Sequence, residues 1–162
     1  MPIDYTLAPM IEPAPGNDQS AKEQYMTKSV SDMISSAETL VPRIDRLKAE
    51  QLISESGAVV VDVRDAPEVE KTGKIAGAIH VSRGMLEFRA DPSCKYHDQA
   101  FSRERTYILY CASGGRSVLS AKVLLEMGYP NVYNLGAFKD WADAGGHVET
   151  PIDPGMQDNP SR

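Results

Sequence analysis

The sequence has only two cysteines in 162 residues, Cys94 and Cys111, and no Cys or His residues at the spacing of a metal site. A secreted scaffold held by disulfides is therefore excluded, and we expect no metal and no other cofactor. No apolar run approaches the length of a membrane span, and the first residues lack the basic and apolar regions of a secretory signal. We expect a chain that works in the reducing cytoplasm and does not contact a membrane.

An excess of positive charge is also missing. The chain has 17 Lys and Arg residues against 23 Asp and Glu residues, which gives a net charge of -6. Proteins that bind nucleic-acid phosphates normally carry a basic surface, so neither DNA nor RNA is an expected partner. The content of hydrophobic residues, 41%, and of charged residues, 25%, is ordinary. It predicts one globular domain with a substantial core.

The ends of the chain differ in composition from its middle. Residues 1–28 carry several prolines and no helical or strand period, which indicates a flexible arm, and residues 151–162 are expected to be a disordered tail. In residues 29–42 apolar side chains recur at helical spacing after Ser29 and Asp32, a pair typical of a capping box. We expect a helix packed on the main domain, with a helix that docks a partner or a second copy as the alternative.

Residues 43–150 form the predicted main domain. Short apolar runs bounded by turn residues predict strands, at residues 58–63, 78–81, 106–110 and 132–135. Helical patterns lie between them, including a strongly apolar one from Ser117 to Met127. This alternation predicts an α/β fold, with a mostly parallel central sheet that is covered by helices on both faces.

The segment most informative about chemistry runs from Cys111 to Ser117 and reads Cys-Ala-Ser-Gly-Gly-Arg-Ser. It connects a predicted strand to a predicted helix, so it lies at the carboxyl edge of the sheet, where open α/β folds bind ligands. Gly114 and Gly115 allow the backbone to turn its N–H groups inward as an anion-binding nest, and the helix adds its positive N-terminal end. A cysteine in this environment is expected to be a nucleophilic thiolate.

Two alternatives to this interpretation concern Cys111 itself. A small buried cysteine at a strand end is common, but it does not explain the Gly-Gly-Arg-Ser that follows. Cysteine phosphatases and arsenate reductases also use a thiolate in an anion cradle, but their loop has one residue more than the four that separate Cys111 from Arg116. The shorter loop fits one sulfur atom bound to the cysteine, so it favours a persulfide over a phosphocysteine.

Four motifs follow one another along the chain: Asp62-Val63-Arg64-Asp65 with Glu68, Gly73-Lys74-Ile75-Ala76-Gly77-Ala78-Ile79, the loop from Cys111 to Ser117, and Gly136-Ala137-Phe138-Lys139-Asp140-Trp141. Together, over residues 41–149, they resemble the rhodanese family of sulfurtransferases in its single-domain form. The family would have His, Pro and a second Gly where this chain has Lys74, Ala76 and Ala137. These departures concern the scaffold.

The resemblance implies sulfur transfer in two half-reactions. The Cys111 thiolate takes the outer sulfur of a donor such as thiosulfate, sulfite leaves, and cyanide or an acceptor thiol then takes the sulfur from the enzyme persulfide. Arg116 is expected to brace the loop or to meet the incoming anion. Loop N–H groups would hold the charge of the persulfide, from Ala112, Ser113, Gly114, Gly115 and Ser117. Ala112 stands where members that use thiosulfate often place a basic residue.

Three charged residues near the first predicted strand are given supporting roles. Arg64 and Glu68 are close enough in the sequence for a salt bridge that fixes the loop after this strand. Asp62, at the end of the strand, is expected to accept hydrogen bonds from groups of the active loop such as Ser117.

The long connection from Arg83 to Ser102 is predicted to be a lid or a binding loop. Arg83 and Arg89 are candidates for the positive charge that the active loop lacks, with Glu87 orienting one of them. The alternative is a solvated helical turn whose apolar residues belong to the core, namely Met85, Leu86 and Phe88. Cys94 is expected to be a bystander rather than a thiol that resolves the persulfide.

Two functions of different classes follow. The first is a sulfurtransferase acting on a small sulfur-containing anion or thiol, with a protein sulfur acceptor as a further option. The second is a non-catalytic module that carries a persulfide or senses oxidants through Cys111, and docks a partner through residues 29–41. A homodimer through the same helix is an additional hypothesis.

Overall fold

The computed structural model describes residues 27–150. The arm predicted at 1–28, apart from its last two residues, and the tail predicted at 151–162 lie outside the described residues. The helices are α2 (Val30–Glu38), α3 (Arg46–Ser56), α4 (Ala66–Thr72), the 3-10 turn η1 (Arg83–Met85), α5 (Leu86–Ala90), α6 (Gly115–Glu126) and α7 (Phe138–Asp143). The strands are β1 (Val59–Asp62), β2 (Lys74–Ile75), β3 (Ile79–His80), β4 (Tyr107–Cys111), β5 (Val132–Ala137) and β6 (Val148–Glu149).

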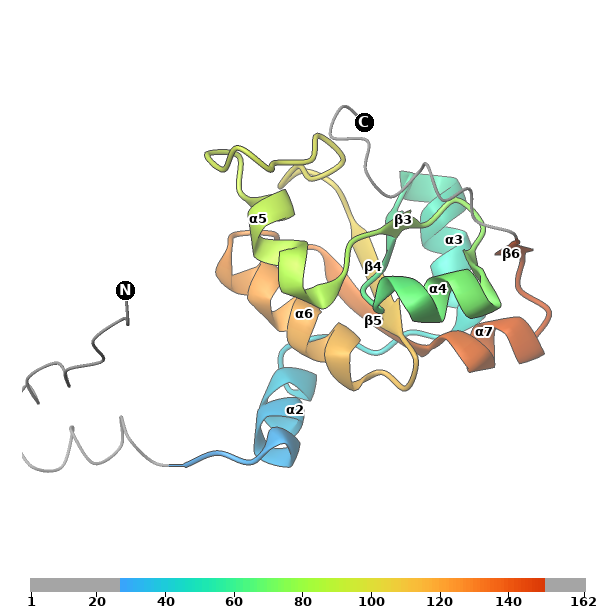
Figure 1. Ribbon diagram of the computed structural model, residues 1–162, viewed down its shortest axis with the longest axis horizontal. Helices are drawn as coiled ribbons and strands as arrows, with labels where there is room; N and C mark the ends of the chain where they lie inside the picture. The colour runs from blue at the N-terminus through green and yellow to red at the C-terminus, as the bar shows by residue number, and fades with distance from the viewer. Residues whose placement is uncertain (1–26, 151–162) are drawn as a thin grey trace, which may run out of the picture.

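Four of these strands form a parallel sheet in the order β3-β1-β4-β5, which confirms the predicted α/β fold (Figure 1). Because the strands are parallel, their carboxyl ends meet at one edge. Asp62 at the end of β1 lies opposite Tyr110, and Cys111 comes one residue later. A separate antiparallel ribbon of β2 and β6 was not expected from the sequence.

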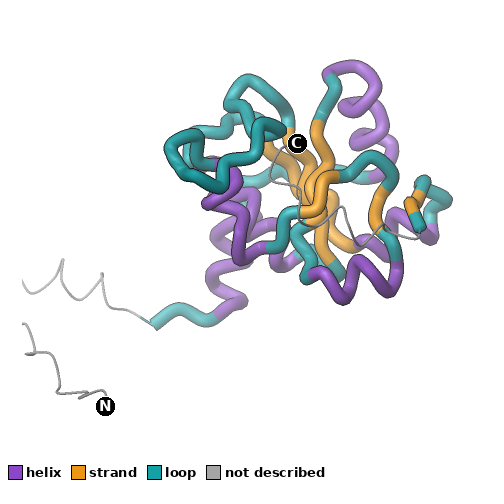
Figure 2. The backbone as a smooth tube through the Cα atoms, turned by 45° about the horizontal axis from the view of Figure 1, so that its top comes forward, coloured by secondary structure: helices purple, strands orange, loops and turns teal. Residues whose placement is uncertain are grey.

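The helices surround the strands of the sheet (Figure 2). The sheet has a hydrophobic core on each face, so its strands are apolar on both sides. Alternate residues of β4 show the division. Leu109 and Cys111 belong to the core on the side of α6, together with Val118. Ile108 and Tyr110 belong to the core that contains the α7 residues Phe138 and Trp141. The helices therefore hold both faces of the strand that carries Cys111.

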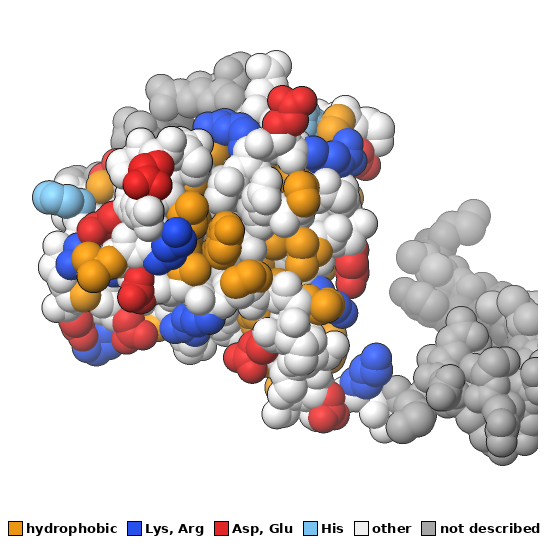
Figure 3. Space-filling model, turned by 180° about the vertical axis from the view of Figure 1, so that it is seen from behind, with side chains coloured by type: hydrophobic (Ala, Val, Ile, Leu, Met, Phe, Trp, Pro, Cys, Tyr) orange, Lys and Arg blue, Asp and Glu red, His pale blue; other side chains and the backbone are white. Residues whose placement is uncertain are grey.

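The N-terminal helix α2 begins with the capping box expected from Ser29 and Asp32, whose side chains bond to each other's backbone N–H groups. It packs against α6 through Ile34 and Ala37. Other members of its apolar pattern are exposed: Val30 to 66%, Met33 to 47% and Leu40 to 56%. The expected single buried face is therefore only partly buried, because α2 lies below the body of the domain and touches it on one side (Figures 1 and 3).

The long connection after β3 begins with η1 and α5 and continues as irregular chain to β4. Leu86 is buried, but Phe88 is 50% exposed, so the expectation that all apolar residues of this turn are core is wrong for Phe88. Phe88 is on the outer side of a helix only five residues long, where one face alone can reach the sheet. Within residues 27–150, no helix combines the length and the hydrophobicity needed to cross a membrane.

Candidate active site

The loop after β4 turns sharply into α6, and glycine makes the turn feasible. Gly114 is the N-cap of α6 and has a φ of 103°, which side chains rarely tolerate. Its N–H donates a hydrogen bond of 3.0 Å to Sγ of Cys111. Gly115 packs closely on α2, since a β-carbon there would lie 3.2 Å from Cδ1 of Ile34. The loop thus curls around the sulfur as the Gly-Gly pair predicts.

Cys111 lies at the bottom of this loop and its side chain is fully buried. Burial raises the pKa of the thiol. Hydrogen bonds from the Ser117 hydroxyl and from the backbone N–H groups of Ser117, Gly114 and Ser113 outweigh burial, so the net pKa lies below the ordinary value for cysteine. The site therefore favours the thiolate, which is the nucleophilic form.

Ser117, one turn into α6, connects the sulfur to β5. Its Oγ lies 3.5 Å from Sγ of Cys111 and 2.8 Å from Oδ1 of Asn134, a buried residue of β5. A hydroxyl has one proton, so it donates to one of these acceptors at a time. The sequence analysis did not single out Asn134, because a polar residue in an apolar strand carries no local signal of its partner.

The side chain of Arg116 is tied to α4. Its two terminal nitrogens bond to the two carboxylate oxygens of Glu68 at 2.7 and 2.8 Å. This pair lowers the pKa of the Glu68 carboxyl to about 2, chiefly through the hydrogen bond from Arg116. The predicted salt bridge between Arg64 and Glu68 is therefore wrong. Glu68 is the third residue of α4 and Arg64 precedes its N-cap Asp65, so the two do not share a helical face.

Arg64 pairs instead with Asp62, at 2.6 Å, in a buried cluster behind the loop. Asp62 also accepts a hydrogen bond of 2.6 Å from the hydroxyl of Tyr110. Burial, followed by the charge of Asp62, raises the pKa of Tyr110, so the phenol stays protonated. The expected contact between Asp62 and Ser117 is wrong, because Asp62 faces the opposite side of the sheet from α6, together with Tyr110.

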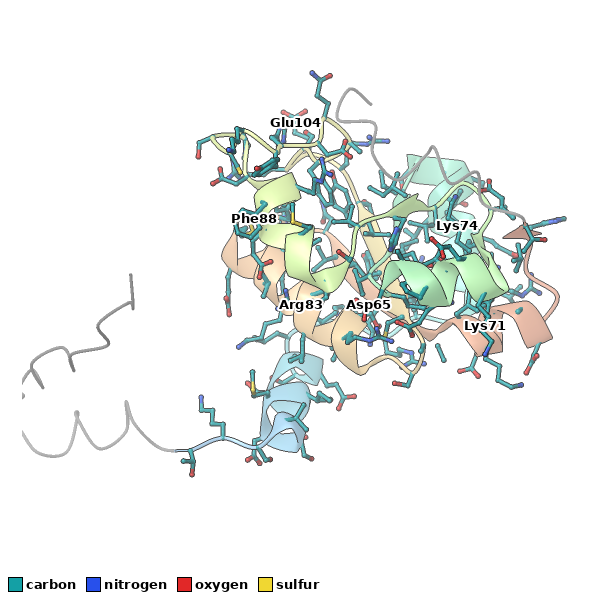
Figure 4. The ribbon with its side chains drawn as sticks, in the orientation of Figure 1. Asp65, Lys71, Lys74, Arg83, Phe88 and Glu104 are labelled. Carbon is teal, nitrogen blue, oxygen red and sulfur yellow. The ribbon has the colours of Figure 1, made fainter. Side chains whose placement is uncertain are left out.

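Of the charged residues in the long connection, Arg83 lies at the same edge of the sheet as the active loop, and Arg89 does not contact that loop. Arg83, the first residue of η1, lies next to the end of β1, since its N–H bonds to the carbonyl of Val63, and Figure 4 shows it at the same edge as Asp65. Its guanidinium contacts Glu87 at 3.0 Å, as expected. Arg89 contacts the carbonyl of Tyr96, in the connection beyond α5, and no described contact joins it to the active loop. A role in substrate binding stays a prediction for these three residues.

The other residues predicted for the site also differ in how close they lie to the sulfur. Ala112 and Ser113 form the exposed tip of the loop, while Gly114 and Ser117 are buried beside the sulfur. Cys94 is half-buried in the long connection, where it accepts a bond from the N–H of Tyr96. Within the described range, no cluster of His, Cys, Asp and Glu side chains is arranged to hold a metal ion.

Together these features define an α/β domain with a cysteine nucleophile, cradled by backbone N–H groups at the carboxyl edge of a parallel sheet. Residues 45–144 match the family described as Rhodanese-like domain. The chain belongs to this family, which confirms the resemblance found in its sequence motifs.

Individual relatives support the assignment. The chain is 33% identical over 100 residues to the thiosulfate sulfurtransferase GlpE of Coxiella burnetii, covering 61% of this chain and 85% of that protein. A solved structure from Rhodopseudomonas palustris, a protein of unknown function described as a possible tyrosine phosphatase, is 37% identical with a TM-score of 0.70, over 78% of this chain and 98% of that one. A human single-domain sulfurtransferase shares the fold, with 20% identity and a TM-score of 0.56 over 64% and 96%.

Proposed function

We propose that this chain is a sulfurtransferase that carries a sulfane sulfur on Cys111, from a donor such as thiosulfate to cyanide or a thiol. The observation that carries the proposal is the cradle of N–H groups around Sγ, which lowers the pKa of the thiol despite its burial. The same dipoles would hold the negative charge of a persulfide. The relationship to GlpE favours thiosulfate as the donor.

In the first half-reaction, the Cys111 thiolate attacks the outer sulfur of thiosulfate. A new S–S bond forms, the S–S bond of thiosulfate breaks, and sulfite leaves with the electron pair. In the second, cyanide or an acceptor thiolate attacks the outer sulfur of the persulfide, and Cys111 leaves as a thiolate. No proton or external oxidant is consumed.

Phosphate-ester hydrolysis is the competing reaction, given the description of the Rhodopseudomonas palustris relative. A phosphatase needs its loop arginine to hold the equatorial oxygens of the phosphoryl group. Arg116 is instead bound to both oxygens of Glu68, and only four residues separate it from Cys111. We therefore expect no hydrolysis of an aryl phosphate.

Intact-protein mass spectrometry tests the proposal. After incubation with excess thiosulfate, the full-length protein and a Cys94→Ser variant should gain one sulfur, and cyanide should remove it as thiocyanate. Cys111→Ser should show no gain and no transfer, with an unchanged unfolding curve, since the two side chains are similar in size. Absence of the adduct with both thiosulfate and a polysulfide, or a full gain by Cys111→Ser, would overturn the mechanism.

Turnover separates the enzyme from the non-catalytic alternative. One sulfur per molecule that no acceptor removes would favour a persulfide-carrying or redox-sensing module that docks a partner. The observation that favours such docking, either to a sulfur acceptor protein or to a second copy, is the exposure of Val30 and Met33 in α2 and of Leu40 just after it. In either case we infer a reducing compartment such as the cytoplasm, where Cys111 returns to the thiolate.

A further inference from the structure

The active loop contains no basic residue between Cys111 and Arg116, so an anionic substrate needs a cation from elsewhere. Arg116 is neutralised by Glu68, and Arg83 is paired with Glu87. Arg43 differs from both, because its guanidinium makes no ion pair and no hydrogen bond with any residue in the range 27–150. An unpaired guanidinium beside a nucleophile is the natural receptor for an anion.

The position of Arg43 is fixed by the backbone. It lies in the connection between α2 and α3, where it forms a parallel bridge with Asn134 of β5. The N–H of Asn134 bonds to the carbonyl of Pro42, and its carbonyl accepts from Ile44. Asn134 is also the residue whose Oδ1 lies 2.8 Å from the hydroxyl of Ser117. One residue thus anchors both the arginine and the active loop.

The guanidinium extends from there over Gly136 to the loop. A β-carbon at Gly136 would overlap it, and Nη1 lies 3.3 Å from where a β-carbon of Gly114 would be. Gly114 is the residue whose N–H bonds to Sγ of Cys111. Only the backbone of one residue therefore separates the charge of Arg43 from the hydrogen-bond shell of the thiolate.

Arg43 also lines a cavity of about 660 Å³, formed with Ile44, Leu47, Leu135, Asp140 and Trp141. The wall holds three other charged residues: Asp45 caps α3, Arg46 pairs with Glu50, and Asp140 lies in α7. The cavity combines apolar side chains with the guanidinium of Arg43, which connects it to the active loop at Gly114. It suits the carbon skeleton of a small acid whose anionic group is held at Arg43.

We propose that Arg43 binds the anionic group, sulfonate or carboxylate, of a sulfur compound that reacts at Cys111. This inference rests on the proposed function for its substrate. The anionic group has two candidate sources. One is the sulfonate end of a donor such as thiosulfate, and the other is the carboxylate of an acidic acceptor thiol.

Alkylation of Cys111 tests the charge without any sulfur transfer. In a Cys94→Ser background, the rates with iodoacetate and with the uncharged iodoacetamide are compared for Arg43, Arg43→Gln and Arg43→Lys. The ratio of the two rates should fall about threefold to tenfold in Arg43→Gln, as expected for the loss of one nearby charge, and recover in Arg43→Lys. Arg105→Gln is the control, since Arg105 follows Glu104 at the far end of the molecule and should leave the ratio unchanged (Figure 4). An unchanged ratio in Arg43→Gln, or equal losses of both rates, would overturn the proposal.

Two further measurements identify the source of the anion. A rise in the thiosulfate concentration needed for half-maximal loading in Arg43→Gln assigns the donor. A lost preference for 3-mercaptopropionate over 2-mercaptoethanol, in discharge of the loaded protein, assigns the acceptor. If loading occurs but neither quantity changes, Arg43 does not bind substrate. A parent protein that never loads sulfur would refute the proposed function, whereas the alkylation ratio would still decide whether Arg43 binds anions at Cys111.

Discussion

The neighbouring strands β1 and β4 each carry a buried acidic group at the same edge of the sheet, and the two groups differ in what binds them. Asp62 of β1 is saturated by side chains, since the guanidinium of Arg64 and the hydroxyl of Tyr110 both bond to it. Cys111 of β4 is held mainly by backbone N–H groups of its own loop. A carboxylate neutralised by a fixed cation is a structural group, whereas a thiolate held by dipoles keeps its charge for reaction.

Removing the negative charge of Asp62 should damage the fold most. Asp62→Asn leaves the buried Arg64 guanidinium without its partner, and we expect a loss of about 3–5 kcal/mol in the free energy of unfolding. Urea denaturation measures it. Asp143→Asn is the control, because Asp143 pairs with Lys139 on the surface and should cost less than about 1 kcal/mol. Equal losses in the two variants would contradict a structural role for Asp62.

Removing a hydrogen-bond donor from Cys111 should affect the reactivity of the thiol more than the stability of the fold. Ser117→Ala removes a hydrogen bond that stabilises the thiolate, so the pKa of Cys111 should rise by about one unit. The pH midpoint of alkylation by iodoacetamide measures this pKa. Ser120→Ala, one turn further along α6 with its hydroxyl on the carbonyl of Arg116, should leave the midpoint in place. A midpoint that does not move in Ser117→Ala would mean that the hydroxyl donates to Asn134 or to the carbonyl of Gly114 and not to the sulfur.

The ion pair between Glu68 of α4 and Arg116 of α6 should contribute least to the free energy of unfolding. The pKa of Glu68 is lowered from 4.5 to about 2, so its contribution to stability is present above pH 4.5 and is lost as the pH falls toward 2. Because both side chains are about one-third exposed, we expect this contribution to be about 1 kcal/mol. Unfolding measured between pH 7 and 3 should show a shallower acid loss in Glu68→Gln. Glu126→Gln, in an exposed pair with Lys122, should behave like the parent protein.

The parallel sheet and the nucleophile could be predicted because their signals are local. Buried strands are continuous apolar runs, and two glycines between such a strand and a helix indicate an anion cradle wherever they occur. A helix end is a signal of the same local kind: Gly57 is the C-cap of α3 and adopts a φ of 62°.

The partners of charged side chains could not be predicted, because they depend on contacts between distant segments. Glu68 bonds to Arg116 and not to its sequence neighbour Arg64, since the start of α4 places the two on different faces. Asn134 and Arg43 meet the active loop only because β5 lies beside β4. No period or motif of the sequence records such a crossing.

The overlap between the side chain of Arg43 and the space above Gly136 has an evolutionary consequence. The φ of 91° at Gly136 already disfavours other residues, and the guanidinium removes the volume that any side chain would occupy. The two positions, far apart in the chain, are therefore constrained to change together. In an alignment of this lineage, members with a side chain at the position of Gly136 should lack arginine at that of Arg43, and should have lost any preference for acidic sulfur compounds along with it.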